Sequence, residues 1–224
     1  MSNMQLDTLR RIVQEINASV SLHDSLDIMV NHVAEAMHVD VCSIYLLDER
    51  NKRYVLMASK GLKPEAVGHV SLNVGEGLVG LVGKREEIVN LDNAPKHERF
   101  AYLPETGEEL FNSFLGVPVM YRRKVMGVLV VQNQEPQDFS EAAESFLVTL
   151  CAQLSGVIAH AHAVGNIDVF RKPTSGSSYK TFQGVSGAGG IALGRAIVLY
   201  PPADLAAIPD REAEDISDEL DLLD

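Results

Sequence analysis

Two β-rich segments near the middle of the chain, residues 117–121 and 125–132, are separated by only three residues, Arg122, Arg123 and Lys124. A turn this short joins antiparallel strands, because a connection between parallel strands needs a dozen residues or more. Valine is frequent in both segments, and β-branched side chains favour strands. The sequence therefore predicts a β-hairpin here and an antiparallel sheet around it.

A second hairpin is predicted earlier, where residues 39–47 and 54–59 flank a polar turn. Alternation in the first of these strands places four residues on one face: Val41, Ser43, Tyr45 and Leu47. Residues 70–74 and 87–91 are expected to form short strands. The polar stretch over residues 92–110 has no clear element, and a connection of this length in a compact domain is typically a functional loop or a lid.

Helices are predicted before, between and after these strands. Ser21, with Asp24 three residues later, is expected to cap an amphipathic helix that ends near Met37. Glycines open a short helix at residues 75–85, and Ser140 caps a long helix over residues 141–162. An earlier helix carries an apolar seam at steps of three and four residues: Leu6, Leu9, Val13, Ile16 and Val20. This order predicts an α+β fold in which helices flank an antiparallel sheet.

The composition changes towards the C-terminus. Residues 171–180 form a linker rich in Pro, Gly and Ser, and residues 182–199 are first glycine-rich and then β-rich. Residues 201–224 contain nine acidic side chains against Arg211 alone, which accounts for −8 of the formal net charge of −12. The first 200 residues are therefore only mildly acidic.

The composition excludes several classes of protein. Cys42 and Cys151 lie in apolar surroundings without a partner spacing, so free thiols are expected, with neither a disulfide nor a zinc site. A pI near 5.0 argues against nucleic-acid binding, which depends on clustered cations. The polar residues 1–11 lack the apolar core of a signal peptide, so a cytoplasmic location is expected.

The long helix expected near residue 150 needs comparison with a membrane span. Residues 146–164 carry no formal charge, and their length is close to that of a transmembrane helix. A stripe of small or polar residues recurs along it at helical spacing: Thr149, Gln153, Gly156 and His160. This stripe favours a packed helix of a soluble protein, and no membrane association is expected.

Three motifs suggest chemistry but are interpreted as structural. Residues 75–80 match G-x-G-x-x-G, yet an antiparallel hairpin follows in place of the βαβ units of a dinucleotide fold. The glycines of residues 186–190 precede a strand-like run, whereas a phosphate cradle needs a helix. His160 and His162 point to different faces of a helix and cannot close a metal site by themselves. With no nucleophile motif present, a ligand-binding sensor without catalytic residues is predicted.

A family resemblance rests on three of these runs. The sequences GEGLVG, FLGVPV and GVLVV, at residues 75–80, 114–119 and 127–131, resemble those of the GAF domain family, and the resemblance covers roughly the first 165 residues. One subfamily is more closely similar: the N-terminal sensor of the nitrogen-related enzyme I, a phosphoenolpyruvate–protein phosphotransferase. The segments that carry this similarity are residues 36–37, 41–46, 56–63, 80–83 and 144–150.

The C-terminal part also resembles this enzyme. Residues 184–194 are similar to the opening strand of the enzyme I phosphotransfer module, although Ala188 and Gly189 replace the usual Ser and Pro. The resemblance implies a GAF sensor domain over residues 1–165, a linker over 166–183, and over 184–224 either the incomplete start of the phosphotransfer module or an acidic tail.

The resemblance also implies an activity for the full-length protein. Such an enzyme uses magnesium and passes phosphate from phosphoenolpyruvate to an HPr-like carrier and on to a nitrogen-related IIA protein. The phosphorylated histidine and the phosphoenolpyruvate barrel of the family lie further along than this chain extends. The chain itself is therefore expected to be catalytically silent and to hold no cofactor.

The resemblance implies a small-molecule effector, glutamine or 2-oxoglutarate. GAF domains that bind cyclic nucleotides share a motif of Asn, Lys, Phe, Asp and Glu. Asn133, Phe139 and Glu144 match this motif, but Gln134 and Ala143 replace the Lys and the Asp. Cyclic-nucleotide binding is therefore the less favoured alternative.

A pocket is expected between the sheet and the connection over residues 92–110. The side chains expected to line it are Ser43, Tyr45, Met57, Ser59, Asn90, Phe100, Ser113 and Phe114. The alternative is an interaction module without a ligand, in which the N-terminal seam pairs with a second stripe across the two-fold axis of a homodimer. That stripe consists of Phe146, Leu150, Leu154 and Val157.

Overall fold

The computed structural model describes residues 3–19, 21–101, 103–106, 111–163, 179–181 and 197–199. The chain divides into two compact units, Met1–Lys172 and Pro173–Asp224. In the second unit β7 (Tyr179–Thr181) pairs antiparallel with β8 (Ile197–Leu199). The rest of the predicted linker, phosphotransfer segment and acidic tail lies outside the described residues.

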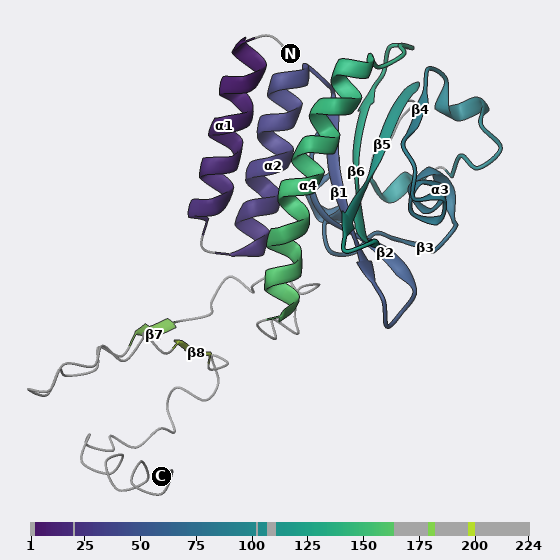
Figure 1. The fold of residues 1–224 in the computed structure, drawn as a ribbon. Helices are drawn as coiled ribbons and strands as arrows, with labels where there is room; N and C mark the ends of the chain where they lie inside the picture. The colour runs from purple at the N-terminus through teal and green to yellow at the C-terminus, as the bar shows by residue number, and fades with distance from the viewer. Residues whose placement is uncertain are drawn as a thin grey trace, which may run out of the picture. The chain divides into compact units, whose positions relative to one another are not determined.

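A six-stranded sheet forms the centre of the first unit, in the order β3-β2-β1-β6-β5-β4 (Figure 1). All five pairings are antiparallel, so both predicted hairpins are confirmed. The longest strand, β6, lies between β1 and β5 and holds the two hairpins together. The strands are β1 (Val41–Asp48), β2 (Arg53–Lys60), β3 (Ser71–Asn73), β4 (Val89–Leu91), β5 (Ser113–Tyr121) and β6 (Lys124–Asn133).

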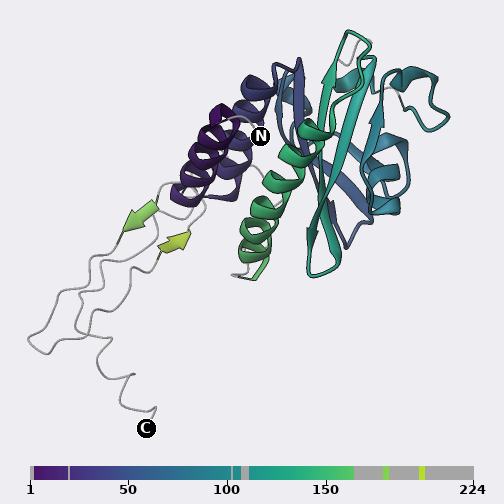
Figure 2. The same ribbon diagram turned by 45° about the horizontal axis from the view of Figure 1, so that its top comes forward.

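Helices cover the sheet on both faces, as Figures 1 and 2 show. On one face lie α1 (Asn3–Ala18), α2 (Leu22–Met37) and α4 (Glu141–Ala163). On the other face lies the short α3 (Gly77–Arg85), together with the connections around it. The predicted α+β architecture, with helices on an antiparallel sheet, is therefore confirmed.

The predicted cap of α2 is confirmed in detail. The Ser21 hydroxyl accepts a hydrogen bond from the main-chain N of Asp24 at 3.1 Å and donates one to the Asp24 carboxylate at 2.7 Å. An N-cap of this kind satisfies one of the N–H groups that a helix leaves unpaired at its start. It fixes the position at which α2 turns onto the sheet.

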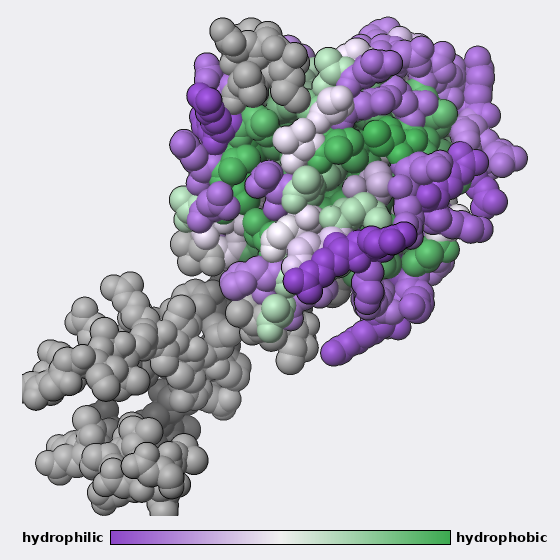
Figure 3. Space-filling model, in the orientation of Figure 1, coloured by the Kyte–Doolittle hydropathy of each residue, from purple (hydrophilic) through white to green (hydrophobic). Residues whose placement is uncertain are grey.

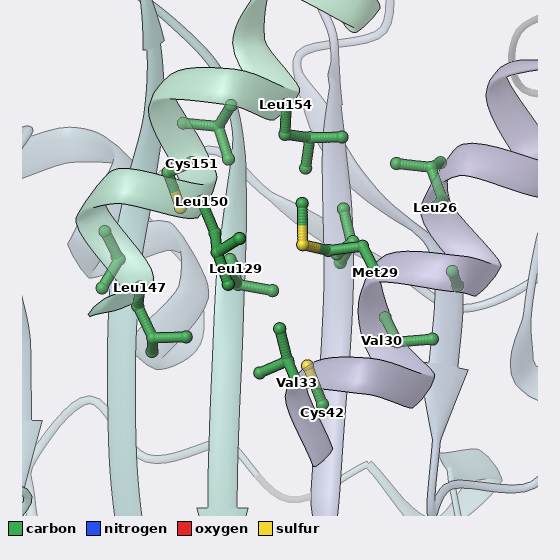
Figure 4. Close-up of a cluster of buried hydrophobic side chains, with 14 of the residues drawn as sticks. Leu26, Met29, Val30, Val33, Cys42, Leu129, Leu147, Leu150, Cys151 and Leu154 are labelled. Atoms are coloured by element: carbon green, nitrogen blue, oxygen red, sulfur yellow. The ribbon is translucent and has the colours of Figure 1, made fainter. Parts of the chain in front are cut away.

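The face under α1, α2 and α4 carries the larger core, named here the helix-side core. Figure 4 shows Met29 and Val33 of α2 and Leu147 and Leu150 of α4 pointing toward one another, with Leu129 of β6 between them. All five side chains are fully buried. Burial of apolar side chains on this scale is the main stabilising contribution to the domain.

Some members of the two stripes that the sequence suggested for a contact with a second copy of the chain lie in the helix-side core. Phe146, Leu150 and Leu154 of α4 are buried against the chain's own sheet, and Ile16 of α1 is buried in the same core. The seam prediction also left out Ile12, which is fully buried. These buried members of the two stripes stabilise the domain itself, whereas Leu9, Val13 and Val157 are half-buried.

By length and composition, α4 is the one helix among the described residues that could cross a membrane. Its apolar side packs on the sheet, as in the core helix of a soluble protein. The predicted stripe of small or polar residues lies on its opposite side, where Gln153, Gly156 and His160 are exposed.

A buried carboxylate holds the turn between β1 and β2. Asp48 accepts hydrogen bonds from the main-chain N of Arg50 and Asn51 at 3.2 and 3.1 Å, and from Asn51 Nδ2 at 2.7 Å. Burial alone would raise the pKa of Asp48, but the bonds from Asn51 and the nearby Arg53 guanidinium outweigh it and hold the pKa below its usual value.

Asp48→Asn is expected to destabilise the domain by about 1–2 kcal/mol at pH 7, because these hydrogen bonds lose their charged acceptor. Since the folded-state pKa is depressed, the contribution is complete above the unfolded-state pKa, about 3.9, and is lost as the pH falls through the folded-state value. Urea midpoints between pH 3 and pH 7 measure this loss. Glu49→Gln, at the exposed neighbouring acid, is the control, and an equal pH dependence in Asp48→Asn and the unmodified chain would contradict the assignment.

Candidate ligand-binding site

The connection between β4 and β5, residues 92–112, is named here the lid. Its described residues, 92–101, 103–106 and 111–112, lie over the sheet face that carries α3. Its two ends meet, because the main-chain N of Ala94 donates to the carbonyl of Asn112 at 2.6 Å. Its middle is docked on a neighbouring loop, since the main-chain N of Lys63 donates to the carbonyl of the buried Thr106 at 3.0 Å. A compact loop with joined ends is a typical ligand-gating element.

A small cavity of about 30 Å³ lies between the lid and the sheet. Its walls come from the sheet, α3 and the lid: Tyr45, Leu72, Leu78, Val79, Phe100, Ala101, Leu103, Phe114 and Gln132. This volume is close to that of a single water molecule, whereas pockets for small molecules are typically 300–1,000 Å³. An amino-acid-sized ligand therefore requires the lid to move.

Uncharged polar groups meet at this cavity. Gln132 and Tyr45 line it although each is less than 5% exposed. Leu78 and Val79 belong to the first turn of α3, whose N–H groups have no partner within the helix. The positive end of the α3 dipole therefore lies near the cavity wall. No charged side chain is among the described residues that line it.

Three of the eight predicted site residues, Tyr45, Phe100 and Phe114, line the cavity. Ser43 and Ser59 lie beside it in β1 and β2, with their hydroxyl oxygens 2.8 Å apart. Ser43 is on the same face of β1 as Val41 and Tyr45, as alternation predicted, but it does not reach the cavity wall.

The remaining three predicted residues lie away from the cavity. Met57 sits at a β-bulge: Ile44 pairs with Ala58 and Tyr45 pairs with Leu56, so Met57 is the extra residue and packs into the helix-side core.

Ser113 precedes Phe114 in β5, so alternation turns it to the helix side, where it is buried and its hydroxyl donates a long bond of 3.4 Å to the carbonyl of Asn133. Asn90 reaches past the sheet edge to α4, with its Nδ2 2.8 Å from Glu144 Oε1. Neither residue contributes to the cavity wall.

Sequence reasoning missed Gln132, the most informative residue of the cavity. It continues the alternation of Val128 and Val130 along β6, and it pairs with Val41 of β1 and Phe114 of β5. A polar residue near the end of an otherwise apolar strand, on the same face as Val128 and Val130, was the signal that could have found it. Leu72, Leu78, Val79, Ala101 and Leu103 are apolar and gave no such signal.

Comparison with known proteins places this geometry in a family. Residues 21–158 match the GAF domain family. Over 167 residues the chain is 41% identical to the phosphoenolpyruvate-dependent phosphotransferase system protein of Escherichia coli, which covers 75% of this chain. The chain spans only 22% of that relative's length.

Solved structures agree. The GAF domain of an Acinetobacter phosphoenolpyruvate-protein phosphotransferase is 84% identical, with a TM-score of 0.68 over 74% of this chain and 99% of that one. The GAF domain of the Coxiella burnetii phosphoenolpyruvate-protein phosphotransferase is 44% identical, with a TM-score of 0.71 over the same shares. A free methionine-R-sulfoxide reductase from Neisseria meningitidis shares the fold, with a TM-score of 0.63 over 73% of this chain and 95% of that one, at 18% identity.

The cysteines of this chain are not placed for thiol chemistry at the cavity. Cys42 and Cys151, the two cysteines of the sequence, are free thiols buried in the helix-side core, across the sheet from the cavity. Burial raises the pKa of both thiols, so neither is a reactive thiolate. From its sequence, sheet and lid-covered cavity, this chain belongs to the GAF domain family, among the GAF domains of phosphoenolpyruvate–protein phosphotransferases.

Proposed function

We propose that this domain is the cytoplasmic small-molecule sensor of a nitrogen-related phosphoenolpyruvate–protein phosphotransferase, and that its effector binds beneath the lid. The observation that carries the proposal is the small cavity beneath the lid, whose walls include Tyr45, Gln132 and the first turn of α3. In the full-length protein the missing part would bind magnesium and pass phosphate from phosphoenolpyruvate to an HPr-like carrier. The domain would regulate that transfer without taking part in it.

The chemistry of the cavity favours a compact molecule with a carboxylate, and we propose glutamine or 2-oxoglutarate. The N-terminus of α3 suits a carboxylate, and the amide of Gln132 and the hydroxyl of Tyr45 suit a neutral amide or keto group. A cyclic nucleotide fits less well. It is larger than glutamine or 2-oxoglutarate, so a cavity of about 30 Å³ would have to open further to hold it.

Thermal unfolding in the presence of each candidate tests the proposal. Glutamine or 2-oxoglutarate at saturating concentration is expected to raise the melting temperature by about 5 °C, while cyclic AMP and cyclic GMP leave it unchanged. Gln132→Leu is expected to reduce this shift, because it removes a polar group from the cavity wall. Gln134→Leu, at an exposed position two residues later, is the matched control. The proposal is wrong if neither glutamine nor 2-oxoglutarate stabilises the unmodified chain.

A second proposed role is homodimerisation, which the exposed side of α4 supports. The helix has no charged residue after Glu144, and its residues that face away from the sheet are exposed or half-buried. Small residues recur on that exposed side at alternating steps of four and three, the spacing of a helix-pairing seam: Ser145, Thr149, Ala152, Gly156, Ala159 and Ala163.

Figure 3 shows a band of pale green and white along α4, with strongly hydrophobic green residues beside it and hydrophilic purple residues further out. A charge-free seam of small side chains suits close approach by an identical seam, since neither copy has to bury a charge. This seam is a further candidate for the contact, beside the stripes that the sequence suggested, several of whose side chains are buried.

A further inference from the structure

We propose that the side chains of Asn90 and Asn112 couple the lid to the start of α4. Asn90 lies just before the lid and Asn112 is its last residue, and both donate hydrogen bonds to the loop that leads into α4, residues 134–139. The inference deepens the proposed function, because it says how a movement of the lid at the ligand site would be transmitted to α4. Its geometry involves the described residues of the first unit alone.

Asn90 holds the end of this loop. It lies in β4, two residues before the lid begins, and its Nδ2 donates to the carbonyl of Phe139 at 2.8 Å and to Glu144 Oε1 at 2.8 Å. Its Oδ1 accepts a hydrogen bond from the main-chain N of Phe139 at 3.3 Å. One side chain therefore binds both main-chain groups of the residue before the α4 cap, and a carboxylate in the first turn of α4.

Asn112 holds the beginning of the same loop. It is the last residue of the lid, and its Nδ2 donates to the carbonyl of Gln134 at 2.6 Å. Its main-chain N donates to the carbonyl of Asn133 at 2.9 Å. The chain at each end of the lid is thus hydrogen-bonded to one end of the loop, so a displacement of the lid would also displace the loop.

The surroundings of the loop over residues 134–139 would allow it to move together with the lid. Residues 134–138 are exposed, and a groove of about 660 Å³ lies beside them, with Met37, Phe139 and Phe146 among its walls. On the lid side, β4 is an edge strand that pairs with only three residues of β5. A short edge strand and an uncovered loop are elements that move at low free-energy cost, whereas the packed sheet between them is rigid.

Amide hydrogen exchange on the full chain tests the coupling without any ligand. Leu103→Ala removes a lid side chain from the cavity wall and loosens the lid. It is expected to speed exchange of the amides in residues 144–147 by about fivefold or more. In the Asn90→Ala/Asn112→Ala background, Leu103→Ala is expected to add no further acceleration there. Leu72→Ala, which trims the same cavity from β3, is the control and is expected to leave these amides unchanged.

Because Asn90→Ala also unpairs the main chain of Phe139, gentler variants test the same link. Glu144→Gln keeps an oxygen acceptor for Asn90 and is expected to retain the response to Leu103→Ala, while Glu144→Ala weakens it. Equal acceleration at residues 144–147 with and without the two asparagines, or none in the otherwise unmodified chain, would overturn the coupling. Failure of glutamine and 2-oxoglutarate to bind would overturn the proposed function alone, since this experiment uses no ligand.

Discussion

Gly127→Ala is expected to destabilise the domain by about 3 kcal/mol, a large share of the stability of an ordinary domain. Gly127 lies in β6, opposite Leu46 of β1 and Val119 of β5. A Cβ atom at this position would overlap the main-chain oxygen of Tyr45 and would lie 3.0 Å from Leu46 Cδ2. Because the obstacle is backbone in a central strand, rotation of a side chain cannot relieve it. The urea midpoint of unfolding measures the loss.

Gly156→Ala is the matched control and is expected to change stability in the opposite direction. Gly156 lies on the exposed side of α4, and a Cβ atom there meets nothing within 4 Å. Alanine in a helix is favoured over glycine by about 1 kcal/mol. Equal and small effects of the two substitutions would show that β1 and β6 do not approach each other as closely as described.

Val148→Glu is expected to convert a dimer of the chain into a monomer, so that the mass in solution falls from twice 24.4 kDa to 24.4 kDa. Val148 is 42% exposed and lies next to the small-residue seam of α4. Glu86 and Glu87 line the same groove as Val148, so in a two-fold contact each copy would add a carboxylate near acids already present, and this repulsion disfavours association. Sedimentation equilibrium at several concentrations measures the mass.

Val74→Glu provides a control of the same chemistry. Val74 is 47% exposed and follows β3, away from α4, so the substitution is expected to leave the mass unchanged. Both valines are exposed in a single copy of the chain, and neither substitution is expected to unfold it. An unmodified chain that sediments as a monomer, or a Val148→Glu chain that stays dimeric, would contradict the α4 contact.

Most of the fold could be predicted from local patterns. Turn chemistry and alternation located the hairpins around residues 48–52 and 122–123, and Ser21 located the start of α2. These signals depend only on neighbouring residues, which the sequence displays directly. Helix pairing was harder, because an apolar stripe such as Phe146, Leu150 and Leu154 has the same pattern whether it faces its own sheet or a second copy.

The candidate site could be predicted only in part, because the pairing register of the strands decides which side chains face the cavity. The bulge at Met57 shifts the facing of β2 by one residue, and no feature of the sequence marks it. Asn90 suggested a ligand contact because it is polar and close to the lid, yet its partners, Phe139 and Glu144, are about 50 positions away. Long-range pairings of this kind follow from the assembled sheet and not from spacing along the chain.

A titration of the isotope-labelled chain with glutamine, followed by amide chemical shifts, tests most directly whether the lid-covered cavity is the sensor site. The account predicts saturable changes that are largest at residues 77–79, in the first turn of α3, and at residues 100–106 of the lid. Spectra that do not change with glutamine or with 2-oxoglutarate, or changes that are largest on the exposed side of α4, would contradict it.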